Sequence, residues 1–351
     1  MESATRRPAV VAMALGLVGA VVAVVLGLLT FGAQATVAPD HLPVAVASPA
    51  DGPAAGQLRT AAEHISTQGG DVVEWRVATP EEARKLLADK EVYGILELTA
   101  VPDGVTPTVV VSGAVNPQGT QIVQQVLTGA AQGFAGALAQ QGVTVAPPTV
   151  ETVHSTSTAG RTAPLAASAL LWVGGFAAAM AFGLLTTRRA GVGARLTLVV
   201  TTSVLTVGAV VGLWKLWDSS LDVDARVLGF LLLTAVAFAA VQGALLRLLH
   251  LRAAAILGPL YLIAPAVAGT VPEMLDPLYR AVLWSWTPFR FSTEGLRSLL
   301  AGTQDAPDVR LGVIVLASMA VAGLLVLLWP TRRREPELEP EPSLVAAQPV
   351  R

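Results

Sequence analysis

The run PAVVAMALGLVGAVVAVVLGLLTFG, residues 8–32, contains no charged side chain. An α-helix needs roughly 20 apolar residues to cross the hydrocarbon core of a bilayer, which is about 30 Å thick. Residues 8–32 are therefore expected to form a first transmembrane helix, preceded by a cytoplasmic N-terminus of residues 1–7. This run decides the fold class, because a chain that contains it must be solvated largely by lipid.

A cleaved signal peptide is the alternative interpretation of the same stretch. Arg6 and Arg7 precede the run, and Ala33-Gln34-Ala35 after it resembles a cleavage site of the A-x-A type. The apolar region of a signal peptide has about 7–15 residues, however, which is shorter than this run. We expect the segment to remain as a helix that spans the membrane.

The composition extends this conclusion to the whole chain. Hydrophobic residues make up 53% and charged residues 14% of the sequence, whereas a soluble domain carries about 25% charged residues. Pro259 and Pro265 interrupt the fifth of the apolar windows, so we expect a bent or broken helix there. Six windows are candidates for transmembrane helices: residues 8–32, 164–187, 196–217, 227–250, 253–271 and 311–329.

Basic residues predict how these helices are oriented. Loops rich in Lys and Arg stay on the cytoplasmic side, and with six spans every basic cluster falls on one side of the membrane. Acidic residues 218, 222 and 224 and the mixed-charge segment 273–310 fall on the other side. Both termini are therefore expected in the cytoplasm, and residues 33–163 outside it. The basic clusters are Arg6 and Arg7; Arg188, Arg189 and Arg195; Arg247, His250 and Arg252; and Arg332, Arg333 and Arg334.

Residues 33–163 contain prolines, polar residues and the alternating apolar positions that are typical of strands. Thr79, followed by Pro80 and Glu82, predicts a helix start, because Thr caps helices and Pro suits the first helical position. The pattern predicts an external α/β domain inserted after the first span, with residues 147–162 as a linker back to the membrane. The expected strands are residues 42–47, 72–77, 92–98 and 108–111, and the expected helices are residues 57–68, 79–89 and 118–141.

Motifs for catalysis or nucleotide binding are missing from the sequence. No G-x-x-x-x-G-K-[ST] loop occurs, and the absence of cysteine excludes disulfides and thiolate chemistry. His41, His64 and His154 lie far apart, without metal-ligand spacing. We therefore expect a protein that is not an enzyme and that holds no cofactor and no metal.

One strongly polar residue lies deep inside a predicted span. Ion-coupled pumps bury ionisable residues at mid-membrane, but the predicted spans carry none at their centres. Gln242 is the most deeply placed polar side chain. It is expected to make a hydrogen bond between helices, or alternatively to contact a substrate.

The segment 270–310 between the last two predicted spans combines short amphipathic stretches with aromatic residues. Trp286 and Phe289 are residue types that suit the membrane interface, and a short helix is expected from Thr293 to Gly302. The segment is a candidate re-entrant structure that dips into the outer leaflet, and a loop lying on the membrane surface is the alternative. Its candidate site residues are Pro272, Trp286, Pro288, Phe289, Arg297 and Gly302.

These residues follow one another in an order that resembles the membrane subunits of ABC-2 type transporters. In that family the last external segment has a Pro, a Pro-aromatic pair, an Arg and a Leu-Leu-x-Gly ending, which matches Leu299-Leu300-Ala301-Gly302 here. The chain is also similar to a branch with a large external domain, the phage-infection-protein group. The matching motifs are LPVAV at residues 42–46, Asp51-Gly52, Glu81-Glu82-Ala83, Tyr93-Gly94-Ile95-Leu96 and Asn116.

The resemblance implies a permease that forms a homodimer or heterodimer and works with a separate ATP-binding cassette subunit. It would export an amphiphilic or envelope-related substrate. Arg188, Arg189 and Arg195 are the candidate ATPase contacts, and a role in topology alone is the alternative for them. The composition, rich in Ala, Val, Gly and Arg, favours a bacterial plasma membrane, and the tail, residues 330–351, is expected to be disordered in the cytoplasm.

Two other functions remain open at this point. The chain could be an envelope protein that does not transport and presents an external domain to a partner or a phage. It could also be a secondary transporter, although the spans lack the buried ionisable residues that such coupling uses.

Overall fold

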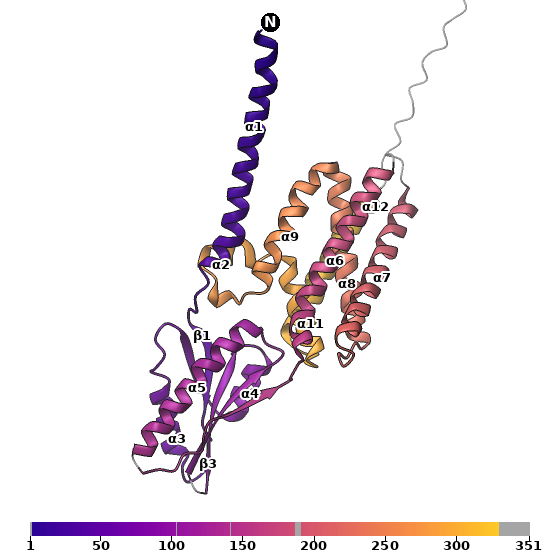
Figure 1. Ribbon diagram of the computed structural model, residues 1–351. Helices are drawn as coiled ribbons and strands as arrows, with labels where there is room; N and C mark the ends of the chain where they lie inside the picture. The colour runs from indigo at the N-terminus through magenta and orange to yellow at the C-terminus, as the bar shows by residue number, and fades with distance from the viewer. Residues whose placement is uncertain (1, 103, 141, 187–190, 330–351) are drawn as a thin grey trace, which may run out of the picture.

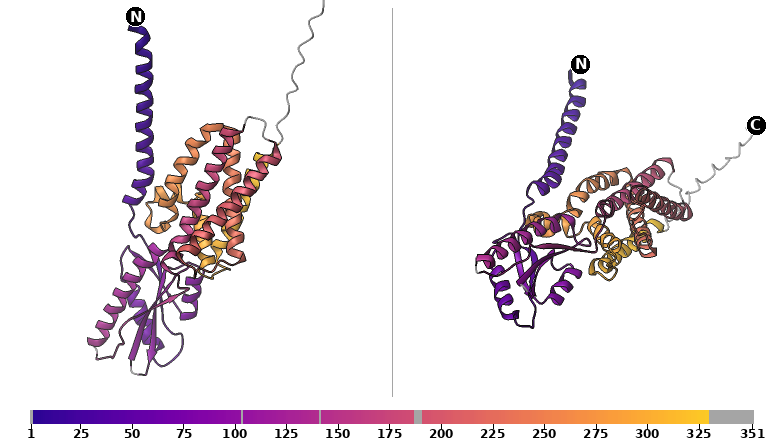
Figure 2. Two further views of the ribbon diagram at one scale, coloured as in Figure 1. Left: turned by 45° about the vertical axis from the view of Figure 1, so that its right-hand side comes forward. Right: turned by 60° about the horizontal axis from the view of Figure 1, so that its bottom comes forward.

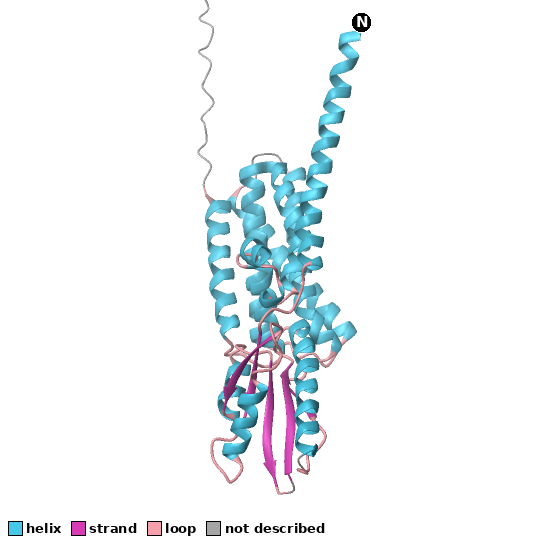
Figure 3. Ribbon diagram, turned by 90° about the vertical axis from the view of Figure 1, so that its left-hand side faces the viewer, coloured by secondary structure: helices cyan, strands magenta, loops and turns pink. Residues whose placement is uncertain are grey.

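The computed structural model describes residues 2–102, 104–140, 142–186 and 191–329 (Figure 1). An α/β domain and a helical bundle lie end to end, and helix α1 stands beside the bundle (Figures 1 and 3). Helix α1, Glu2–Gly27, continues through the π-helical turn η1, Leu28–Gly32, into α2, Ala33–Ala35. The tail, residues 330–351, lies outside the described residues.

The α/β domain is built on a five-stranded sheet with the strand order β2-β1-β3-β4-β5. Strand β1 runs parallel to β2 and β3, β3 and β4 form an antiparallel pair, and β5 runs parallel to β4. The strands are β1, Leu42–Ala47; β2, Val73–Ala78; β3, Gly94–Val101; β4, Gly104–Ser112; and β5, Thr149–Val153.

Helices cover both faces of this sheet. Alternate residues of β1 serve both faces: Val44 and Val46 belong to the core under α3 and α5, whereas Ala45 and Ala47 belong to the core under α4. A strand buried on both faces reads as a continuous apolar run, as β1 does. The helices are α3, Ala55–Ile65; α4, Pro80–Ala88; and α5, Pro117–Gln140.

Local signals predicted the start of α4 correctly but missed a strand. The Oγ1 of Thr79 accepts the backbone N–H of Glu82 at 3.3 Å, which is the expected helix cap. The predicted linker, residues 147–162, instead contains the edge strand β5, and α6 begins at Thr158. Strand β5, TVETV, has two valines three positions apart among Thr and Glu and follows two prolines, so it lacks the alternating pattern that signals a strand.

The bundle surrounds one large apolar core that includes the rings of Trp172, Phe238 and Phe289. Helices α8 and α12 share the most extensive contact, and the short helix α11 packs against α6, α8, α9 and α12. The helices are α6, Thr158–Leu185; α7, Val192–Trp217; α8, Ala225–Leu249; α9, Ala254–Ala268; α11, Pro288–Leu300; and α12, Pro307–Leu328.

Within the described residues, five helical stretches are long and apolar enough to cross a membrane. The fourth and fifth windows of the sequence fall into one such stretch, Ala225–Ile263. Helix α8 ends just before His250, whose φ is +54°, and the chain reverses its direction there between α8 and α9 (Figures 1 and 2). Helix α9 is continuous over its 15 residues, so a broken helix inside the fifth window is wrong, whereas a bent one stays a prediction.

The α/β domain and the outer ends of the helices lie at opposite ends of the molecule. The start of α1, the turn between α8 and α9 and the end of α12 lie away from the α/β domain, which occupies the opposite end (Figure 1). Helix α1 leaves most of its surface uncovered, with only 6% of its apolar window buried. The turn η1 that continues it contacts the segment between α9 and α12, where the hydroxyl of Tyr279 donates to the carbonyl oxygen of Leu28 at 2.9 Å.

Candidate functional site

The segment between α9 and α12 folds into short turns and then into the helix α11, Pro288–Leu300. Pro272 and Pro288 stand at the first positions of their helices, where the missing N–H leaves no bond unmade. Helix α11 therefore begins at Pro288, and the expected start at Thr293 is wrong. The turns are η3, Pro272–Met274; α10, Pro277–Tyr279; and η4, Arg280–Trp284.

The aromatic residues of this segment have two different environments. The ring of Phe289 is fully buried, 5.0 Å from Trp172 of α6 and 5.4 Å from Phe238 of α8 between ring centroids. Such spacings are favourable for aromatic pairs. The ring of Phe289 therefore packs inside the bundle core, and its depth in the membrane stays a prediction, whereas Trp286 is 54% exposed.

The polar side of α11 is buried against protein. The Oγ of Ser292 lies 2.8 Å from the Oγ of Ser168 on α6, and the Oγ1 of Thr293 lies 3.2 Å from the same atom. All three hydroxyl residues are fully buried. Buried polar groups need hydrogen-bond partners within the protein, and these hydroxyls supply one another.

An ionic cluster joins α11 and α12 to the α/β domain. The Nζ of Lys90, at the turn from α4 to β3, lies 2.5 Å from the Oδ2 of Asp308 on α12 and 3.9 Å from the Oε2 of Glu294 on α11. Arg297 forms a further ion pair with Glu294, and the Oγ of Ser298 lies 2.9 Å from Asp308 Oδ2. The four charged side chains are only 5–25% exposed, so water screens them weakly.

Charge balance keeps the carboxylate of Glu294 ionised. Burial alone raises the pKa of Glu294, but the positive charges of Arg297 and Lys90 outweigh it and hold this pKa below its ordinary value. Glu294 is therefore a carboxylate at neutral pH. Lys90 has a φ of +61°, a left-handed conformation that is uncommon for residues other than glycine.

Two further hydrogen bonds accompany the cluster. The hydroxyl of Tyr93 donates to the Oε2 of Glu273 at 2.7 Å, and the Nδ2 of Asn116 donates to the carbonyl oxygen of Gly269 at 3.1 Å. Burial raises the pKa of Tyr93 well above its ordinary value, so its hydroxyl stays a donor. Together with Lys90, these residues fasten the α/β domain to the segment that contains α11.

Gly302 ends helix α11 as the sequence predicted. Its φ of +78° is a conformation that glycine adopts readily. The N–H of Gly302 donates to the carbonyl of Leu299 at 3.1 Å, and that of Thr303 to the carbonyl of Ser298 at 2.9 Å. This pair of hydrogen bonds is a Schellman motif, and it directs the chain from α11 into α12.

Gln242 lies in the bundle core, fully buried. Its Nε2 donates to the backbone oxygen of Trp172 at 2.9 Å, which links α8 to α6. A Cβ added to Gly175 would lie 2.4 Å from its Oε1, so this glycine lets the two helices approach closely. Gly174 faces Thr206 of α7 in the same way, whereas Gly183 has no described neighbour within 4 Å.

The candidate ATPase contacts are only partly described. Arg188 and Arg189 lie outside the described residues. The Nη1 of Arg195 donates to the backbone oxygen of Leu327 at 3.1 Å, and Arg247 donates to the same oxygen at 2.7 Å. Both arginines thus bind the last carbonyls of α12, a favourable place for cations, which identifies a structural role for them.

Sequence reasoning did not find Lys90, Ser168 or Asp308 as members of this site. Lys90 and Asp308 are 218 positions apart, and a lysine after a helix is ordinarily a solvated residue. The one sequence signal for Lys90 was indirect: Asp308, in the first turn of α12, needed a cationic partner. Among the described residues, no group of three or more His, Asp or Glu side chains could hold a metal ion.

These features define a polytopic helical membrane protein in which a short buried helix is joined to a sheet domain. The family model of the ABC-2 family transporter proteins matches residues 12–329, and the chain belongs to this family. Neither a curated protein nor a solved structure matches the chain. The chain is therefore a membrane component of a transporter whose family pairs with an ATP-binding subunit.

Proposed function

We propose that the chain is the permease subunit of an exporter that moves an amphiphilic substrate outward across the plasma membrane. ATP hydrolysed by a separate subunit would drive the movement. The observation that carries this proposal is the family match over residues 12–329, which includes the whole bundle and helix α11. We further propose that two permeases associate, because α1 leaves most of its apolar surface uncovered.

The proposed orientation has six crossings, both termini in the cytoplasm and residues 33–163 outside. Helix α9 has 15 residues and is about 22 Å long, so the chain that follows it completes the fifth crossing within the outer leaflet. Two described places with basic residues support this orientation: Arg195 near the start of α7, and His250 and Arg252 in the α8–α9 turn. Both places lie away from the α/β domain (Figure 2).

Single introduced cysteines test this orientation, since the native sequence contains no cysteine. In intact cells, a maleimide that does not cross membranes should label Glu74→Cys in the α/β domain. It should label Leu251→Cys at the α8–α9 turn only after permeabilisation. Labelling in the reverse order would overturn the orientation.

Helix α11 is the proposed moving contact between the outer domain and the bundle. Its buried hydroxyls hold it to α6, and its ion pairs hold it to α12 and Lys90. A change in the separation of α6 and α12 would therefore be transmitted to the α/β domain. This is how closure of the ATPase subunits would open an outward path without any catalytic residue in this chain.

The partner is tested by affinity purification of the tagged protein from its native host in mild detergent, with and without prior crosslinking. A stoichiometric ATP-binding cassette protein should co-purify. If both preparations yield none, the proposal fails, and the α/β domain is then better studied as a binding module.

A further inference from the structure

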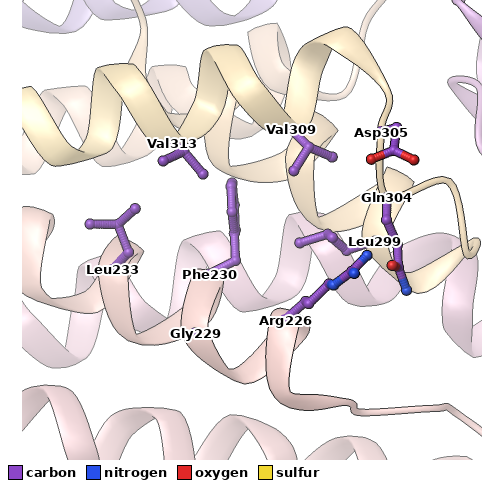
Figure 4. Close-up of a pocket in the computed structure, with 9 residues that line it drawn as sticks. All are labelled: Arg226, Gly229, Phe230, Leu233, Leu299, Gln304, Asp305, Val309 and Val313. Atoms are coloured by element: carbon purple, nitrogen blue, oxygen red, sulfur yellow. The ribbon is translucent and has the colours of Figure 1, made fainter.

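We propose that a groove between α8, α11 and α12 binds one membrane phospholipid with a zwitterionic, phosphoethanolamine-type head group. The groove has a volume of about 440 Å³ and is lined by residues of α8, α11 and α12 and of the loop between α11 and α12 (Figure 4). It lies at the end of the bundle that faces the α/β domain, because Asp308, next to the lining residue Val309, pairs with Lys90 of that domain. A role for this lipid in transport, as the substrate or as a bound lipid that accompanies helix movement, rests on the proposed function. The binding itself is independent of that function and can be measured without it.

The deep wall of the groove is apolar. Phe230 and Leu233 of α8 face Val309 and Val313 of α12 across it (Figure 4). Val313 is 41% exposed, and the neighbouring Leu232 of α8 is 38% exposed. The wall is therefore continuous with the lipid-facing surface of the helices, and an acyl chain could enter from the side.

The shape of the groove depends on two glycines. A Cβ added to Gly295 of α11 would lie 2.4 Å from the ring of Phe230, and one added to Gly312 of α12 would lie 2.9 Å from it. The ring thus occupies space that both glycines leave free. This places Phe230 as the fixed inner wall, with the cavity in front of it.

The mouth of the groove is polar and carries both signs of charge. Arg226, Gln304 and Asp305 lie together at one end, and Leu233 and Val313 lie at the other (Figure 4). In the described part of the chain, the side chains of these three residues make no hydrogen bond and no ion pair with another residue. A guanidinium suits a phosphate, and a carboxylate suits an ammonium group, so the mouth fits a zwitterion.

The spacing of mouth and wall suits such a molecule. Arg226 and Leu233 are seven positions apart on α8, which corresponds to about 10 Å along a helix. Charged groups lie at one end of this distance and apolar ones at the other. A mouth that carried only positive charge would instead favour an anionic lipid, and the unpaired carboxylate of Asp305 argues against that.

Native mass spectrometry of the detergent-purified full chain tests the proposal. The probe is palmitoyl-oleoyl phosphatidylethanolamine, added in increasing amounts. Val313→Trp should fill the groove and weaken binding about tenfold or more, equivalent to at least one strong contact. The matched control is Val321→Trp, on an exposed part of α12 that does not line the groove, and it should stay within about twofold of the native chain.

The head group is tested by two exposed substitutions that do not disturb the core. Arg226→Gln should weaken binding of both phosphatidylethanolamine and phosphatidylglycerol, whereas Asp305→Asn should weaken only the former. Equal binding by Val313→Trp and Val321→Trp would overturn the site. An unchanged affinity of Asp305→Asn for phosphatidylethanolamine would overturn the zwitterionic head group. Neither result depends on an ATPase, so each is distinguishable from failure of the proposed function.

Discussion

Replacing Lys90 by Met tests whether ion pairs fasten the α/β domain to the bundle. Methionine keeps the length of the side chain and the same left-handed backbone cost, but it removes the charge. The Nζ of Lys90 lies 2.5 Å from Asp308, where the gross attraction is about 7 kcal/mol at an effective dielectric constant of about 20. Most of this is cancelled by the cost of removing both ions from water.

The burial of the pair sets the net effect. Exposed pairs contribute at most about 1 kcal/mol, and breaking a fully buried pair costs about 3–5 kcal/mol. The side chains of Lys90 and Asp308 are 14% and 20% exposed, and Asp308 keeps its contact with Ser298. We therefore expect a loss of about 2 kcal/mol, which makes opening of the junction about 30 times more frequent.

Hydrogen–deuterium exchange of the purified protein measures this opening directly. Peptides covering the α4–β3 turn and residues 295–310 should exchange about 30 times faster in Lys90→Met. The control is Lys85→Met, on the exposed face of α4, which should leave both peptides unchanged. Equal exchange in the two variants would show that the cluster does not hold the domains together. A double-mutant cycle with Asp308→Asn then isolates the pair itself.

Three further predictions concern Glu294, the contact between α8 and α12, and the last carbonyls of α12. The folded pKa of Glu294 lies below the ordinary value of 4.5. Its contribution to stability is therefore complete above pH 4.5 and is lost as the pH falls through the lower folded pKa. Hydrogen–deuterium exchange at the junction, corrected for intrinsic rates, should accelerate only below pH 4.5. Gly323→Ala places a Cβ 2.7 Å from backbone atoms of α8 and should destabilise the bundle by about 1–3 kcal/mol, seen as a lower aggregation temperature in detergent, whereas Gly208→Ala, with no neighbour within 4 Å among the described residues, should not. Arg247→Met removes the donor to the last carbonyls of α12, so peptides ending at residue 329 should exchange faster, and the exposed Arg252→Met should leave them unaltered.

Much of the helical framework was predictable because hydropathy is a local property. The window 311–329 coincides closely with α12, Pro307–Leu328, since a span is defined by its own residues. The cap of α4 was equally local: Thr79 and Glu82 are three positions apart. Strand β1 lies at the predicted residues 42–47, because its apolar run stands between turn formers.

The site itself was less predictable, because its partners are distant in sequence. Helix α11 carries Ser292, Thr293 and Arg297 and therefore resembles a helix on a membrane surface. Its burial becomes evident only when α6 supplies Ser168 as a partner. The same applies to Phe289, an aromatic residue whose interface position was predicted from type alone and whose ring is buried. Composition identifies polar and apolar stretches, but tertiary packing decides what covers them.

The central claim is that this chain is a permease subunit driven by a separate ATPase. The most direct measurement is ATP hydrolysis by the affinity-purified complex, reconstituted into lipid nanodiscs and assayed with and without vanadate. The account predicts vanadate-sensitive hydrolysis that co-purifies with the tagged chain and changes in Lys90→Met relative to Lys85→Met. Hydrolysis that is absent from the complex, or that is retained in full when the tagged chain is depleted, would contradict it.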